Sequence, residues 1–137
     1  MRPIILNLGR HRVCWRNRRG NFERARELFE QGIAADPHHA PLWQAWGLLE
    51  KEVGNITRAR ELFEQGTAAD PHHAPLWQAW GLLEKEVGNI TRARELFEQG
   101  TAANSHHTPT LYAWGLLEKE AGNLVRAREL FEAGTTA

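Results

Sequence analysis

Three pairs of adjacent histidines recur along the chain, and imidazole is a common nitrogen ligand of transition metals in proteins. The pairs are His38-His39, His72-His73 and His106-His107. Adjacent side chains in a turn point apart, and equivalent loops of a repeat array lie only side by side. We therefore interpret these histidines as structural turn residues, and we predict no metal site.

Catalytic chemistry has no recognisable arrangement of residues in this sequence. No nucleophile, general base and orienting residue occur together in a known pattern. The recurring Gly-Asn pairs lack the glycine-rich run that precedes a phosphate-binding helix. Cys14 is the single cysteine, so no internal disulfide forms. We expect a protein without catalytic residues and without a cofactor.

The elements that position these residues come from a repeat of constant length. Every interval between equivalent positions is 34 residues. Gly-Asn recurs at Gly20, Gly54, Gly88 and Gly122, and the string ARELFE begins at Ala25, Ala59, Ala93 and Ala127. Residues 20–53 and 54–87 differ at only three positions, which indicates recent duplication or design.

Within each unit, two runs of helical periodicity are separated by helix breakers, so each unit is predicted to be a helical hairpin. Pro41 suits the first turn of one helix, Gly54 can close that helix, and Asn55 can cap the next. Asp70, which precedes a proline, ends the second helix. Seven helices are expected, near 21–35, 41–53, 55–69, 75–87, 89–103, 109–121 and 123–136.

Apolar and charged residues on the second helix indicate how the hairpins pack. Ala59, Leu62, Phe63 and Gly66 alternate small and large side chains at helical spacing, which predicts a packing seam. Five of the six tryptophans recur at packing positions, so we expect them in the core. Arg60 lies one turn before Glu64, which indicates a solvated ion pair within the helix.

Charge divides the chain into a basic N-terminal segment and an acidic remainder. Residues 1–19 hold six arginines and no acidic residue, which leaves 11 basic and 17 acidic side chains in residues 20–137. We assign 1–19 to a divergent or foreign segment, similar to an organellar transit peptide, and 20–137 to the repeat domain. A uniformly basic nucleic-acid surface is excluded, and no apolar run is long enough to span a membrane, so we expect a soluble intracellular chain.

The repeat resembles the tetratricopeptide repeat, which also has 34 residues, at Trp43, Trp46, Gly47, Ala59, Phe63, Gly66 and Pro71. Glu50 stands where that pattern expects an aromatic residue, and this makes the units more similar to the half-a-tetratricopeptide (HAT) variant. The resemblance implies an all-α fold, a right-handed α-α superhelical solenoid of helix-turn-helix repeats, with about three and a half repeats. It also implies a role in RNA metabolism, in spliceosomal, RNA-processing or organellar RNA-maturation factors.

In repeat stacks of this kind the first helices line the concave surface, so the resemblance implies a ligand-binding face there. The residues expected on it are Gln44, Leu48, Lys51, Glu52, Gln78, Leu82, Lys85, Glu86, Tyr112, Leu116, Lys119 and Glu120, with His72 and His73 from a loop. Glutamine, lysine and tyrosine can contact single-stranded RNA, whereas glutamate opposes phosphate.

Two functions remain open at this stage. The first is a non-catalytic scaffold of RNA processing or messenger-RNA stabilisation that binds single-stranded RNA or a partner protein. The alternative is a general protein-protein interaction module without RNA contact. A lysine stripe clear of carboxylates would favour RNA, and neutralised lysines would favour protein. We also expect end-to-end self-association, because Leu130 and Phe131 are predicted to be exposed on the last helix.

Overall fold

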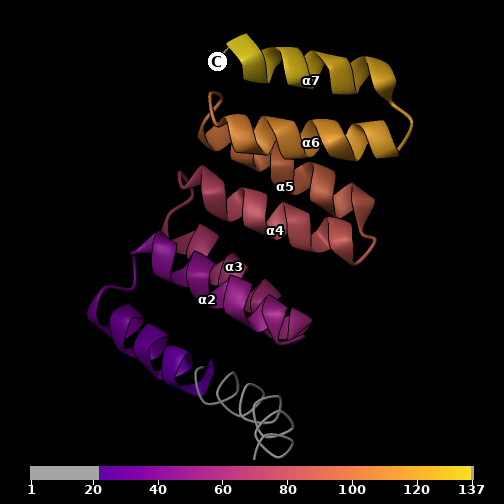
Figure 1. Cartoon of the computed structure of the whole chain (residues 1–137). Coiled ribbons are helices and arrows are strands. Elements are labelled where there is room, and N and C mark those ends of the chain that lie inside the picture. Colours follow the sequence, from indigo (N-terminus) through magenta and orange to yellow (C-terminus); the bar gives the residue numbers. More distant parts are fainter. Residues whose placement is uncertain (1–21, 137) are drawn as a thin grey trace, which may run out of the picture.

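Seven helices joined by short turns make up residues 22–136, the part of the chain that the computed structural model describes (Figure 1). The first helix covers residues 22–35. The others are α2 (Ala40–Glu52), α3 (Ile56–Ala69), α4 (Ala74–Glu86), α5 (Ile90–Ala103), α6 (Thr108–Glu120) and α7 (Leu124–Thr136). The predicted all-α repeat architecture is confirmed, with boundaries within one residue of those expected. The prediction about residues 1–19 lies outside the described residues.

Proline and glycine set the ends of the helices as the sequence predicted. A proline occupies the first turn of α2, α4 and α6. Gly54, at the turn between α2 and α3, has φ +93°, and Gly88 and Gly122 take the same left-handed conformation at the equivalent turns. A side chain there would be strained. The sharp reversal between the two helices of a hairpin therefore depends on glycine.

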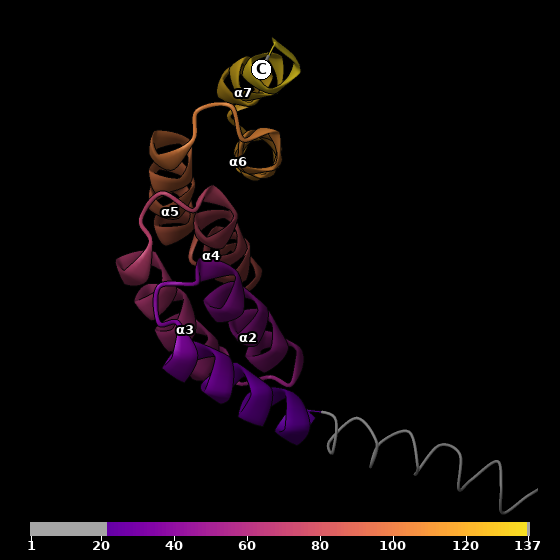
Figure 2. The ribbon, with the colours of Figure 1, turned by 90° about the vertical axis from the view of Figure 1, so that its left-hand side faces the viewer.

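The hairpins stack into an array with two layers of helices. In Figure 2, α2, α4 and α6 follow one another along one side of the array, while α3 and α5 lie on the other side. Helix α4 contacts α5 within its own hairpin and also α2, α3 and α6 of the neighbouring hairpins. Each hairpin thus buries its apolar surface against its neighbours, as expected for a repeat solenoid.

Small residues allow the two layers to approach closely. The ring of Phe63 packs against Gly47, where a Cβ atom would collide with it, and Phe97 packs against Gly81 in the same way. Leu62 and Phe63 are both fully buried. Trp43, Trp46, Trp80 and Trp114 are buried and Trp77 is half-buried. The predicted packing seam and the assignment of these tryptophans to the core are confirmed.

The exposed residues of the last helix differ from the prediction. Leu130 is 3% exposed and Phe131 is half-buried, because the α6 side of the hairpin covers them. The exposed apolar side chains are Leu124 and Val125, at 62% and 76%. No helix in the described residues is both long and apolar enough to cross a membrane.

Candidate functional site

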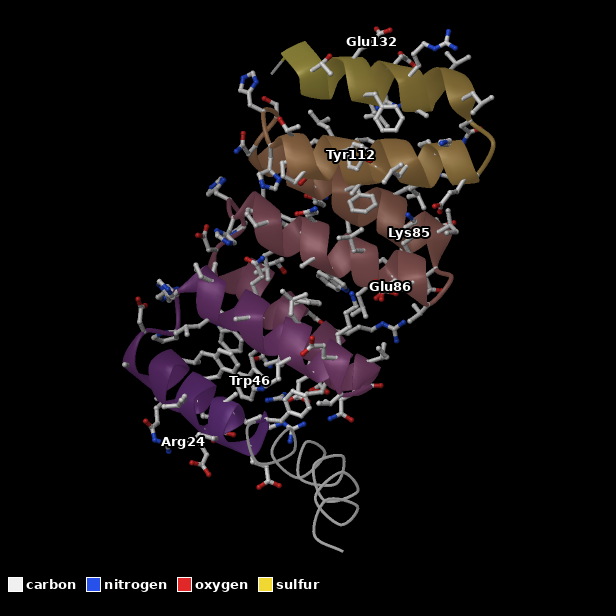
Figure 3. The ribbon with its side chains drawn as sticks, viewed as in Figure 1. Arg24, Trp46, Lys85, Glu86, Tyr112 and Glu132 are labelled. Carbon is white, nitrogen blue, oxygen red and sulfur yellow. The ribbon has the colours of Figure 1, made fainter. Side chains whose placement is uncertain are left out.

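The residues expected to bind a ligand lie along α2, α4 and α6, and we call their common surface the first-helix face. It consists of Gln44, Leu48, Lys51, Glu52, Gln78, Leu82, Lys85, Glu86, Tyr112, Leu116, Lys119 and Glu120. Figure 3 shows Lys85, Glu86 and Tyr112 on the side of the array that these helices form. The structure brings several members of this set into direct contact.

Lysine and glutamate side chains of successive hairpins pair across the first-helix face. Lys51 Nζ lies 2.8 Å from Glu86 Oε1, and Lys85 Nζ lies 3.3 Å from Glu120 Oε2. Both lysines are largely covered, while the two carboxylates are more than half exposed. Lys119, at the end of this ladder, makes no ion pair with the described residues. Two of the three lysines are therefore neutralised, so the face does not present a continuous positive stripe.

The amide side chains of this face join neighbouring hairpins. His73 Nε2 lies 3.1 Å from Gln44 Oε1, which links the loop before α4 to α2. Gln78 Nε2 donates to the Pro109 carbonyl at 3.4 Å, which links α4 to α6. Gln44 is half-buried rather than exposed. These contacts reduce the freedom of both amides to bind a ligand.

Apolar side chains remain exposed between the charged pairs. Leu48 is 39% exposed and Tyr112 is 58% exposed. The ring of Tyr112 packs beside Phe131 of α7, with the centroids 5.7 Å apart. Leu82 contributes less than expected, because it packs against the hydrophobic core. The first-helix face thus combines paired charges with separate apolar contacts.

A buried carboxylate cluster, which the sequence analysis missed, joins each second helix to the next hairpin. Glu84 is 3% exposed. It accepts hydrogen bonds from Arg60 Nε at 2.7 Å, Arg60 Nη2 at 3.1 Å, Trp80 Nε1 at 3.2 Å and Asn89 Nδ2 at 2.8 Å. Burial alone would raise the pKa of Glu84, but these donors outweigh it and hold the pKa below its ordinary value.

The same cluster occurs around Glu50 and Glu118. Arg26 pairs with Glu50 and Arg94 pairs with Glu118, in each case with a 2.7 Å contact from Nε. The pKa of Glu118 is lowered mainly by its bond to Arg94. Each arginine lies 24 residues before its glutamate, and this constant spacing was a signal in the sequence.

Two sequence predictions about these polar residues are wrong. Arg60 does not pair with Glu64 on its own helix, because its guanidinium reaches Glu84 of the next hairpin. Asn55 stands at the N-cap of α3 but makes no side-chain cap hydrogen bond. Its Nδ2 instead donates to Glu50 Oε1 at 2.9 Å. Both side chains serve the contact between helices rather than the helix that carries them.

The histidine pairs lie in the turns before α2, α4 and α6 and have local contacts. The backbone N–H of His72 donates to Asp70 Oδ1 at 3.1 Å, as in an Asx turn. His107 Nδ1 lies 2.6 Å from Thr110 Oγ1, and burial, with a smaller effect of His73, lowers the pKa of His107. The described residues include no group of three or more histidines, cysteines, aspartates or glutamates placed to hold a metal.

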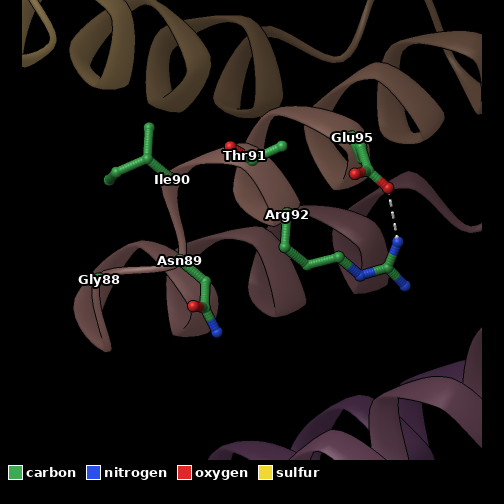
Figure 4. Close-up of a pocket in the computed structure, with 6 residues that line it drawn as sticks. All are labelled: Gly88, Asn89, Ile90, Thr91, Arg92 and Glu95. Atoms are coloured by element: carbon green, nitrogen blue, oxygen red, sulfur yellow. Dashed lines mark hydrogen bonds and ion pairs between the residues drawn. The ribbon is translucent and has the colours of Figure 1, made fainter.

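The hollows on the described surface are open and carry no recognisable catalytic group. One, of about 420 Å³, lies at the start of α5 and is lined by Gly88, Asn89, Ile90, Thr91, Arg92 and Glu95 (Figure 4). Arg92 Nη1 lies 3.0 Å from Glu95 Oε2, and the guanidinium stacks 4.9 Å from the centre of the Trp80 ring. These charged groups already have partners within the fold.

Comparison with protein families gives one match over most of the chain. The model described as the pre-mRNA-splicing factor Syf1/CRNKL1 C-terminal HAT repeat matches residues 5–137. The match starts within the segment 1–19, outside the described residues. No curated protein sequence matches the chain.

Solved structures of similar fold contain tetratricopeptide-like arrays. The crystal structure of MamA has a TM-score of 0.70 and 19% identity, over 86% of this chain and 69% of that one. The second TPR of Spaghetti (RPAP3), bound to the HSP90 peptide SRMEEVD, has a TM-score of 0.66 and 20% identity, over 75% of this chain and 96% of that one. Pseudomonas aeruginosa pilF has a TM-score of 0.68 and 17% identity, over 80% and 50% of the chains. At these identities the likeness shows the repeat fold.

Proposed function

Because the chain belongs to the family of the pre-mRNA-splicing factor Syf1/CRNKL1 C-terminal HAT repeat, we propose that it is a non-catalytic scaffold of RNA processing that holds a partner protein on its first-helix face. The family and the fold are those of helical-repeat scaffolds for protein interaction. The choice of ligand class depends on the charges of the face.

The pairing of Lys51 with Glu86 and of Lys85 with Glu120 carries this proposal. Phosphate binding needs cations that can exchange their counterions for the backbone of the nucleic acid. In these pairs a carboxylate of the protein already neutralises the lysine, and the carboxylate itself repels phosphate. A protein segment can instead use the exposed Leu48 and Tyr112 side chains and the paired charges around them.

A fold neighbour supplies a second argument for a protein ligand. The second TPR of Spaghetti (RPAP3) is bound to an HSP90 peptide, SRMEEVD. Repeat arrays present an extended surface of successive helices, and such a surface suits an extended or helical peptide segment. We infer that the first-helix face accommodates a segment of this kind.

The test is a pull-down from a cell extract with the full chain, with and without RNase. A variant with Leu48→Glu and Tyr112→Ala disrupts the exposed apolar part of the face, and Leu28→Glu introduces the same charge at a 49% exposed leucine on the helix over 22–35. We expect the wild type and Leu28→Glu to retain the same proteins after RNase treatment, and the face variant to lose them. Release of every partner by RNase would instead indicate RNA as the ligand.

The setting within RNA metabolism is part of the same proposal. The matched family model names a pre-mRNA-splicing factor, which supports a role in splicing. The resemblance of the repeats to organellar RNA-maturation factors supports an organelle such as the chloroplast. A fluorescent fusion at the C-terminus of the full chain distinguishes the two, because nuclear signal supports splicing and organellar signal supports RNA maturation there.

A further inference from the structure

The end of the array formed by α7 carries a surface that occurs twice more inside the fold. A hollow of about 350 Å³ is lined by Lys119, Leu124, Ala127, Arg128, Phe131, Glu132 and Thr135. The residues 34 positions earlier belong to α5, and those 68 positions earlier belong to α3. We call this surface the α7 end face. Its equivalents inside the array show what kind of element covers it.

On α5, the equivalent surface is covered by α6 of the next hairpin. Ala93 and Phe97 are fully buried in a cluster that includes Leu117 and Trp114 of α6. On α3, Phe63 is buried in the same way against Leu83 of α4. Within the described residues no such helix lies on α7, where Phe131 is half-buried and Leu124 is 62% exposed.

The charges of the α7 end face complement a carboxylate. Arg26, Arg60 and Arg94 each pair with a buried glutamate of the hairpin that follows. Arg128 is the next arginine in this series, and it is exposed and makes no ion pair with the described residues. A guanidinium that binds both oxygens of a carboxylate is a directional contact, so it selects the position of the glutamate on an incoming helix.

Free space on α7 matches an apolar side chain of such a helix. A Cβ atom added at Gly66 of α3 would collide with Leu76 Cδ2 of the next hairpin, so this leucine occupies the space above the glycine. At Gly134 of α7, the equivalent glycine, an added Cβ would lie 3.7 Å from its nearest neighbour, Thr108 Cγ2. The position above Gly134 can therefore receive a leucine.

We propose that the α7 end face binds an amphipathic helix of a separate polypeptide, with leucine, tryptophan and glutamate at the spacing of Leu76, Trp80 and Glu84. The glutamate pairs with Arg128, the tryptophan donates its indole N–H to the same carboxylate, and the leucine packs over Gly134. This site is formed by α7 rather than by the exposed apolar residues of the first-helix face, and it does not depend on the function proposed there.

The test uses the full chain and a labelled synthetic peptide with the sequence of residues 74–89, APLWQAWGLLEKEVGN, which covers α3 in the structure. Fluorescence anisotropy is expected to show saturable binding. Arg128→Glu in the chain should weaken binding at least tenfold, and so should Glu84→Gln in the peptide. A peptide with Glu84→Arg should bind Arg128→Glu better than it binds the wild type.

A second variant separates docking from folding. Gly134→Leu fills the space above α7 with a residue of higher helix propensity, so the chain should keep its circular dichroism and thermal midpoint while losing the peptide. Gly134→Ala is the matched control and should bind more tightly than Gly134→Leu. Absence of saturable binding, or equal binding by wild type, Arg128→Glu and Gly134→Leu, would overturn the proposal. A dimer in sedimentation that Arg128→Glu abolishes would also overturn it, because the occupant would then be a second copy.

Discussion

At the scale of single residues, the buried glutamates show how a polar group can hold a repeat array together. A carboxylate removed from water loses several kcal/mol of hydration unless charged or polar donors replace the water. Glu84 receives such donors from Arg60 of one hairpin and from Trp80 and Asn89 of its own. Because Leu or Phe at this position could not use these donors, the cluster specifies which helix follows which.

Replacement of Glu84 by glutamine should destabilise the chain by about 1–3 kcal/mol, since the amide cannot accept from all these donors and leaves buried groups unsatisfied. Glu86→Gln is the matched control, on the same helix but 56% exposed and in a surface ion pair. Its cost should stay below about 1 kcal/mol. Urea unfolding monitored by tryptophan fluorescence gives both values, and equal midpoints for the two variants would contradict the role of the cluster.

The pH dependence of stability should also report on Glu84. Its pKa in the folded chain lies below the ordinary value of 4.5, so the unfolded chain takes up a proton first as the pH falls. The contribution to the free energy of unfolding is therefore present above pH 4.5 and lost below it. Glu84→Gln should lose stability less steeply than the wild type below pH 4.5, and Glu86→Gln should follow the wild type. Parallel curves for wild type and Glu84→Gln would count against the cluster.

At the scale of helices, the sequence predicts the elements well and the contacts between them less well. Periodicity and the breakers at Pro41 and Gly54 locate the helices, because these signals act within a few residues. Arg60 was assigned to Glu64 since one turn of helix is the distance that a single helix reveals. Its true partner, Glu84, becomes adjacent only when hairpins stack. The first-helix face could be listed by residue for the same reason, but not its ion pairs.

The two faces of a hairpin should differ in their tolerance of alanine. Phe63 is fully buried against Gly47, and its truncation leaves a cavity. Gln44 is half-buried and loses one polar contact with His73. Phe63→Ala should therefore destabilise the chain by about 3 kcal/mol more than Gln44→Ala. Chemical denaturation of the two variants measures this, and a difference near zero would mean that the assigned core face is wrong.

At the scale of the whole molecule, near-identical hairpins give a surface whose properties repeat along the array. Each hairpin contributes the same lysine and glutamate, and the glutamate of one hairpin neutralises the lysine of the hairpin before it. Lys119 follows this rule only in part, because the described residues include no glutamate after Glu120 in that series. Repetition thus cancels most of the positive charge that each hairpin would show by itself.

This cancellation predicts how the chain responds to RNA and salt. For single strands, log affinity falls with log salt by about 0.7 for each phosphate neutralised, so one unpaired lysine, Lys119, implies a slope near −0.7 and weak binding. The double variant Glu86→Gln, Glu120→Gln frees Lys51 and Lys85, and its slope should approach about −2. Any preference should be for a homopolymer tract, because Gln44 and Gln78 present the same group in successive hairpins. Fluorescence anisotropy with the four RNA homopolymers at two salt concentrations measures both slopes. A wild-type slope as steep as that of the double variant would show that the ion pairs do not hold in solution, and the case for a protein ligand on the first-helix face would fall with them.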